Sequence, residues 1–141
     1  DVTGRLNDNW SLIGSYAYTD ARVTEDPTLV GNALQNVAMN TASLYLVYDF
    51  LDVLPGRLRL GGGAHYVGKR AGDAANTFTL PSYVVADIFA SYETRLQNVP
   101  VVYQLNVKNL FDTVYYPSAA SQYFVAMGDA RRVSLSATAK F

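Results

Sequence analysis

The last ten residues of the chain alternate strictly between apolar and polar side chains. From Arg132 to Phe141 the sequence reads RVSLSATAKF, which places Val133, Leu135 and Phe141 on one face together with two alanines. A period of two is typical of a β-strand with one apolar and one polar face, and an amphipathic helix cannot accommodate it. This segment therefore predicts a strand that continues to the final residue of the sequence.

Five further segments upstream repeat the alternation. They are Trp10–Thr19, Ala42–Phe50, Leu58–Val67, Val84–Glu93 and Val101–Lys108. All are longer than the roughly five to six residues of an ordinary globular strand, and no segment shows a convincing helical pattern. We predict an all-β fold, an antiparallel up-and-down meander of about six long strands.

The connections between these segments alternate in length. Leu51–Gly56 and Leu96–Pro100 are short and carry Pro, Gly, Asn or Asp, which are turn residues. Thr24–Asn40, Lys69–Pro81 and Asp112–Ala130 are long and mostly polar. Tight turns at one end and long loops at the other are typical of a transmembrane β-barrel.

The charge content separates two kinds of β protein. Charged residues make up 16% of the 141 residues while 50% are hydrophobic, and soluble domains usually contain about 25% charged residues. A soluble β-sandwich or barrel remains the alternative, but it would carry a densely charged exterior. We therefore favour a transmembrane β-barrel. The formal net charge of -1 argues against a nucleic-acid partner, because such proteins are clearly basic.

The sequence offers little material for catalysis or metal binding. It contains no cysteine and one histidine, which excludes disulfides, thiolate zinc sites and multi-histidine metal sites. His65 lies within a predicted strand, and no nucleophile–base arrangement accompanies it. We expect no catalytic residues and no metal ligands.

Aromatic residues fall into two groups. The first lies near strand ends on the apolar face, where rings settle at membrane interfaces. It comprises Trp10, Tyr48, Phe50, Tyr66, Tyr92 and Phe141. The second lies in the last long loop and comprises Tyr115, Tyr116, Tyr123 and Phe124. Two interpretations of the second group stand side by side: packing within the loop, or a stacking surface for a ligand.

Several motifs resemble one family. Asn106–Asp112 (NVKNLFD), followed by Tyr115 and Tyr116, is similar to the N-x-x-N-L-F-D-x-x-Y-Y signature near the C-terminus of TonB-dependent outer-membrane receptors. Gly128–Arg132 resembles the segment that opens their last strand, and Phe141 matches their terminal aromatic residue. Upstream, the resemblance to siderophore receptors of the ferrichrome type is carried by Gly61–Gly63, Tyr66–Arg70, Leu80–Tyr83 and Asp87.

The resemblance covers essentially the whole chain and implies a fold and a location. The family has a barrel of about 22 strands preceded by a plug and a TonB box. Residues 1–141 are then expected to be the C-terminal portion of a receptor barrel, with the plug domain and earlier strands absent. Such a barrel is integral to the bacterial cell outer membrane and is not an enzyme.

The resemblance also implies function and partners. The receptor is expected to take up ferric siderophores by TonB-dependent active transport, with the iron carried by the siderophore and no cofactor bound directly. Its expected partners are the ferric siderophore, outer-membrane lipid, the TonB complex through the absent N-terminal region, and the barrel-assembly machinery that reads Phe141. A passive porin-like barrel and an outer-membrane enzyme are the alternatives.

An orientation follows if Phe141 ends the closing strand, because the C-terminus is then periplasmic. The three long loops are extracellular in that case. The loop between Asp112 and Ala130 has the most aromatic rings of the three. We expect ligand contacts from its four aromatic residues, Tyr115, Tyr116, Tyr123 and Phe124.

Overall fold

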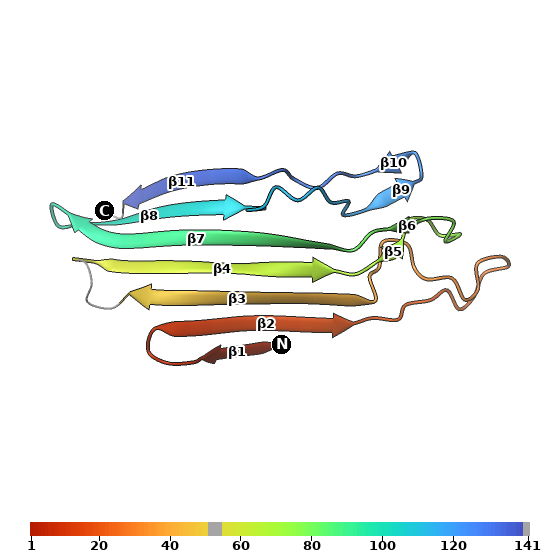
Figure 1. The fold of residues 1–141 in the computed structure, drawn as a ribbon, viewed down its shortest axis with the longest axis horizontal. Coiled ribbons are helices and arrows are strands. Elements are labelled where there is room, and N and C mark those ends of the chain that lie inside the picture. The colour runs from red at the N-terminus through yellow and green to blue at the C-terminus, as the bar shows by residue number, and fades with distance from the viewer. Residues whose placement is uncertain (51–54, 140–141) are drawn as a thin grey trace.

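Seven strands form one antiparallel sheet in the computed structural model, which describes residues 1–50 and 55–139. Their order in the sheet is β1-β2-β3-β4-β7-β8-β11, so each long strand pairs with the next one along the chain (Figure 1). They are β1 (Val2–Arg5), β2 (Trp10–Tyr18), β3 (Asn40–Phe50), β4 (Arg57–Val67), β7 (Tyr83–Leu96), β8 (Val99–Lys108) and β11 (Arg132–Ala139).

The six long predicted strands and their sequential antiparallel order are confirmed. The sheet also contains the short strand β1, which the sequence analysis did not identify because four residues are too few to display a period of two. None of the described residues is helical. Accordingly, no helix among them is long and apolar enough to cross a membrane.

The strand register keeps apolar residues together across the sheet. Residues that pair directly lie on the same face, and one continuous row of pairs consists of Trp10, Tyr48, Leu60, Ala90, Leu105 and Leu135. The polar positions form the other face. There, Asp49 pairs across the strands with Arg59, and its carboxylate lies 2.9 Å from the Arg59 guanidinium and 3.2 Å from that of Arg57.

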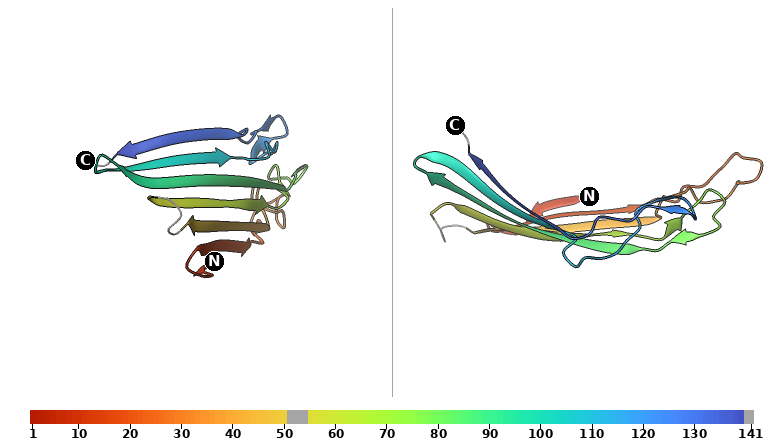
Figure 2. Two further views of the ribbon diagram at one scale, coloured as in Figure 1. Left: turned by 60° about the vertical axis from the view of Figure 1, so that its left-hand side comes forward. Right: turned by 90° about the horizontal axis from the view of Figure 1, so that it is seen from above.

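Within residues 1–50 and 55–139, no second sheet or helix packs on the apolar face. Among the described residues, no large side chain is fully buried, and Leu135 is 76% exposed. The sheet is a single curved layer (Figure 2), without the second layer that a sandwich uses to cover its apolar face. The soluble sandwich is therefore wrong for this chain, and the sheet has the form of a barrel wall.

The two ends of the sheet differ, as the connection lengths predicted. Gln97 and Asn98 form a two-residue turn between β7 and β8, and both have positive φ (48° and 68°), as a type I′ hairpin requires. Most of the predicted turn at Leu51–Gly56 lies outside the described residues, as does Phe141. The opposite end carries the long loops and two small hairpins (Figure 1), β5 (Arg70–Ala71) with β6 (Thr79–Leu80) and β9 (Ala119–Ser121) with β10 (Phe124–Val125).

Candidate ligand-binding site in the long loops

Three loops make up the long-loop end of the sheet: residues 19–39, 68–82 and 109–131. We refer to them as the first, second and third loops. The first and second loops are joined by a reciprocal pair of hydrogen bonds, from the Ala33 N–H to Asn76 Oδ1 (2.9 Å) and from Asn76 Nδ2 to the Ala33 carbonyl (3.0 Å). The Asn36 N–H adds a bond of 2.9 Å to the Ala71 carbonyl of β5. These three hydrogen bonds give the two loops a defined relative position.

Arg70 joins the second loop to the third. It is only 4% exposed, and its guanidinium donates to the carbonyls of Gly68 (3.2 Å), Pro81 (3.5 Å) and Tyr116. The same group lies 5.2 Å from the centre of the Tyr83 ring, within cation–π range. No carboxylate forms an ion pair with Arg70 in the part of the chain that the structure describes. Because it is buried, this cation holds loops together and is not presented to a ligand.

Two of the four predicted ligand-binding residues are packed. The Tyr115 ring lies 4.6 Å from the Tyr83 ring, and it also covers Gly128, where a side chain would collide with it. Tyr116 is half-buried, and its carbonyl accepts the bond from Arg70. Loop packing therefore explains both positions without a ligand.

The other two predicted residues are exposed. Tyr123 is 82% exposed and Phe124 73% exposed, at the end of the hairpin formed by β9 and β10. They belong to the third loop at the end of the sheet opposite the tight turns (Figure 1). Because aromatic rings bury a large area at small conformational cost, this hairpin offers the better contact surface. The structure thus divides the four aromatic residues into a packed pair and an exposed pair.

A short turn built by the NLFD string brings the two ends of the third loop together. Asn109 and Asp112 both have positive φ (49° and 54°), a conformation that Asn and Asp tolerate better than most residues. The Asp112 carboxylate accepts a bond of 2.8 Å from the Arg131 N–H, one residue before β11. This turn returns the chain from β8 toward β11.

Asn109 is the structural centre of that turn, a role the sequence analysis did not assign. Its side-chain amide donates to the carbonyls of Thr113 and Asp129 (both 2.9 Å) and accepts from the Thr113 N–H (2.8 Å). Its own N–H donates to the Asp87 carboxylate of β7 at 2.8 Å. Asn109 is the first residue of the NLFD motif, which was recognised in the sequence. The motif indicated a family, but it did not predict the hydrogen bonds that Asn109 makes.

A local turn also orders the first loop. The Asp26 carboxylate accepts hydrogen bonds from the N–H groups of Thr28 (2.8 Å) and Leu29 (2.9 Å). The bond from the Thr28 backbone is the main reason that the pKa of Asp26 lies below its ordinary value. Asp26 therefore stays ionised while it makes these bonds and is not poised to exchange protons.

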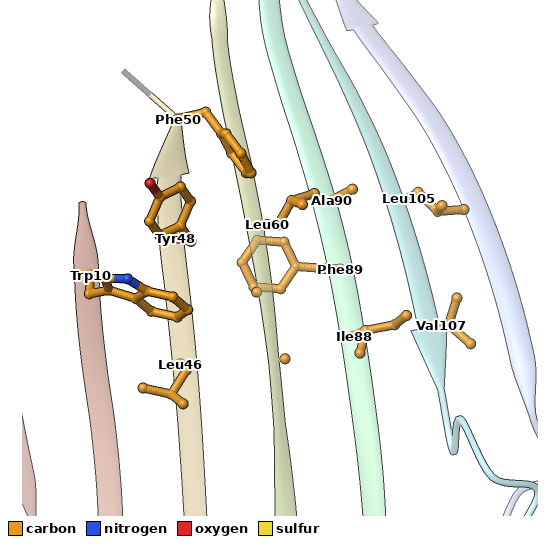
Figure 3. Close-up of a pocket in the computed structure, with 12 residues that line it drawn as sticks. Trp10, Leu46, Tyr48, Phe50, Leu60, Ile88, Phe89, Ala90, Leu105 and Val107 are labelled. Carbon is orange, nitrogen blue, oxygen red and sulfur yellow. The ribbon is translucent and has the colours of Figure 1, made fainter. Parts of the chain in front are cut away.

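The described residues contain no group of three or more His, Cys, Asp or Glu side chains that could hold a metal ion. A hollow of about 740 Å³ lies instead on the apolar face, near the tight turns (Figure 3). Its lining includes Trp10, Tyr48, Phe50, Leu60, Ile88 and Leu105, together with Gly61 and Gly62. Because its lining is mostly apolar, the hollow lacks the set of convergent polar groups that orient a ligand.

The aromatic rings beside the hollow form a continuous row. The ring centres of Trp10 and Tyr48 are 4.8 Å apart, and those of Tyr48 and Phe50 are 4.6 Å apart, both in edge-to-face geometry. All three residues lie where β2 begins and β3 ends (Figure 3). Aromatic rings gathered near the strand ends of a barrel wall are typical of a membrane interface.

The comparison with protein families agrees with this architecture. Residues 1–110 match the profile of the family described as TonB dependent receptor-like, beta-barrel. The chain is 36% identical over 141 residues to the metal-pseudopaline receptor CntO of Pseudomonas aeruginosa, covering 99% of this chain and 20% of that protein. It is 38% identical over 142 residues to the ferrichrome outer membrane transporter/phage receptor of Escherichia coli K12, covering 100% of this chain and 19% of that protein.

Solved structures show the same likeness. The ferric preacinetobactin receptor BauA of Acinetobacter baumannii matches with a TM-score of 0.88 and 29% identity, over 99% of this chain and 21% of that chain. The siderophore receptor PiuA of the same organism matches with a TM-score of 0.78 and 32% identity, over 96% of this chain and 20% of that chain. The chain therefore spans about one fifth of the length of each of these four relatives.

Proposed function

Because the chain belongs to the TonB-dependent receptor-like β-barrel family, we propose that it is a barrel segment of a receptor that takes up ferric siderophores by TonB-dependent active transport. The bacterial outer membrane is the location of this family. The observation that carries the proposal is the match over at least 99% of the chain, third loop included, to receptors for metal-pseudopaline and ferrichrome.

The matched relatives favour a transport receptor over the alternatives. The polar face of the sheet would line the barrel interior, and the apolar face with its aromatic row would contact outer-membrane lipid. The matched relatives are named as receptors and transporters, and nothing specific favours a passive porin-like barrel or an enzyme. We propose no catalytic activity and no directly bound cofactor, since the siderophore would carry the ferric iron.

The remaining partners belong to the same proposal. Residues 1–141 would form the C-terminal portion of the barrel, and the TonB complex would act through the N-terminal region of the receptor. Phe141 would be read by the barrel-assembly machinery, and this stays a prediction because it lies outside the described residues.

For the ligand contacts we propose the exposed pair, Tyr123 and Phe124. Tyr115 and Tyr116 would support them indirectly, by holding the third loop in place through their contacts with Tyr83 and Arg70. In the orientation with a periplasmic C-terminus, the hairpin that carries the exposed pair faces the cell exterior, where a ferric chelate arrives.

Replacing both Tyr123 and Phe124 by Ala in the whole receptor tests this site. Ferrichrome and ferrioxamine B, each loaded with iron, serve as probes, since relatives of this chain are named for them. We expect the double variant to bind the complex recognised by the unaltered receptor at least about tenfold more weakly, which corresponds to about 1.4 kcal/mol. Surface expression should be unchanged, because neither side chain is packed.

Phe111→Ala is the matched control. Phe111 is 75% exposed and lies in the same loop, but it belongs to the NLFD turn and not to the hairpin. Its replacement should leave the affinity within about twofold, roughly 0.4 kcal/mol. The proposed contacts are wrong if the double variant also stays within that margin.

A further inference from the structure

We propose that Asn36 is the positioning residue for the hairpin formed by β9 and β10. This inference deepens the proposed function, since that hairpin carries Tyr123 and Phe124. Asn36 lies 83 positions before Ala119, in the first loop, and it touches neither aromatic residue through any hydrogen bond found in the described structure. Its role would be to set where the hairpin stands and not to contact the ligand.

The side-chain amide of Asn36 pairs with both backbone groups of Ala119. Its Nδ2 donates to the Ala119 carbonyl at 2.9 Å, and its Oδ1 accepts from the Ala119 N–H at 2.9 Å. Gln35 Nε2 donates to the same Ala119 carbonyl at 2.8 Å. Ala119 is the first residue of β9 and is buried, so these bonds hold the base of the hairpin.

The hairpin leaves this edge of β9 open for Asn36. The Ala126 N–H donates to the Ser118 carbonyl at 2.9 Å, and Ala119 pairs in register with Val125 as the next step of the ladder. Hydrogen-bonded and non-hydrogen-bonded pairs alternate in an antiparallel ladder, so the N–H and carbonyl of Ala119 point away from β10. The side-chain amide of Asn36 bonds to both of these groups, as the backbone of a neighbouring strand would.

The backbone of Asn36 is itself fixed. Its φ is +63°, and its N–H donates to the Ala71 carbonyl of β5. The preceding Gln35 amide also donates to the Gly72 carbonyl at 3.0 Å. Asn36 therefore bonds to the second loop through its backbone N–H and to the third loop through its side chain. In this way it fixes the position of the third loop relative to the second.

The test is Asn36→Gly in the whole receptor. Glycine adopts positive φ without strain, so this change removes the side-chain bonds and leaves the backbone conformation available. The matched control is Asn98→Gly, which makes the same change at another positive-φ position (68°) in the tight turn between β7 and β8. Amide hydrogen exchange of the segment 118–121 measures, without any ligand, how firmly the base of the hairpin is held.

We expect Asn36→Gly to speed exchange in that segment at least about fivefold, because two hydrogen bonds are lost. The affinity for the iron-loaded ferrichrome or ferrioxamine B that the receptor binds should fall about three- to tenfold, with an unchanged unfolding temperature. Asn98→Gly should change neither. If Asn36→Gly does not assemble, Asn36→Asp replaces it, since it sets an oxygen against the Ala119 carbonyl and should give the same exchange result.

Unaltered exchange in residues 118–121 would overturn the proposal. So would faster exchange with unaltered affinity, because the bonds would then be structural only. An unaltered receptor that binds neither iron complex would count against the proposed function, while the exchange result would still decide whether Asn36 positions the hairpin.

Discussion

Single asparagine and aspartate residues shape the loops of this protein. Asn36, Asn76, Asn109 and Asp112 all have positive φ, and the side chain of each bonds to backbone groups elsewhere in the loops. Their short polar side chains reduce the cost of the left-handed conformation and supply donors and acceptors at once. The loops are therefore held by a few polar residues and not by a hydrophobic core.

Asn109→Ala should destabilise the folded receptor strongly. Asn109 is 3% exposed, and the change removes three side-chain hydrogen bonds and leaves a β-carbon in a left-handed conformation. We expect a loss of about 2–4 kcal/mol in the free energy of unfolding, measured by denaturant unfolding in lipid vesicles. Asn98→Ala is the control, an exposed position with similar φ, and it should cost only about 1 kcal/mol. Equal losses in the two variants would contradict the role assigned to Asn109.

Within a strand, adjacent residues lie on opposite faces of the sheet, one apolar and one polar. In β8, Leu105 pairs with Ala90 and Leu135 on the apolar face, while Gln104 pairs with Ser91 and Ser136 on the polar face. A charge should therefore be costly at one position and tolerated at the next, because only the apolar face meets hydrocarbon.

Leu105→Arg and Gln104→Arg form a matched pair that tests this assignment. We expect the first to cost about 2–4 kcal/mol of folding free energy, as for a cation on the lipid face near the middle of a bilayer. The second should leave the yield of folded receptor nearly unchanged, judged by heat-modifiable mobility of the outer-membrane fraction. The opposite ranking would mean that the two faces have been assigned the wrong way round.

The whole sheet has two open edges and an uncovered apolar face. β1 and β11 lie at the ends of the strand order, and neither has a partner on its outer side within the described residues. Open edges pair readily with other chains, and large apolar patches drive association. In the receptor, further strands and lipid would cover both.

A polypeptide of residues 1–141 prepared alone should therefore associate in water. We expect light scattering after size-exclusion chromatography without detergent to report oligomers or aggregates. Detergent should reduce the association, because it covers the apolar face. A monodisperse monomer that melts cooperatively in detergent-free buffer would contradict the barrel-wall interpretation.

The local pattern of the sequence was sufficient to predict most of the sheet. Alternation assigns each residue to a face, and turn residues mark where strands end, because both depend only on neighbours along the chain. For this reason the six long strands, the apolar face of each strand and the contrast between the two ends were predictable, whereas the register that aligns Trp10 with Leu135 was not. The NLFD motif indicated the family, since it too is a short string that can be recognised without knowing the fold.

Only the tertiary structure decided how the loops are joined and which aromatic residues are free. The Asn36–Ala119 bonds connect residues 83 positions apart, and Arg70 meets Tyr116 across 46 positions. Tyr115 and Tyr123 lie in the same loop, yet one is packed and the other is exposed. Such contacts form only after the strand register has brought distant backbone groups together, and no local periodicity encodes which donor will then face which acceptor.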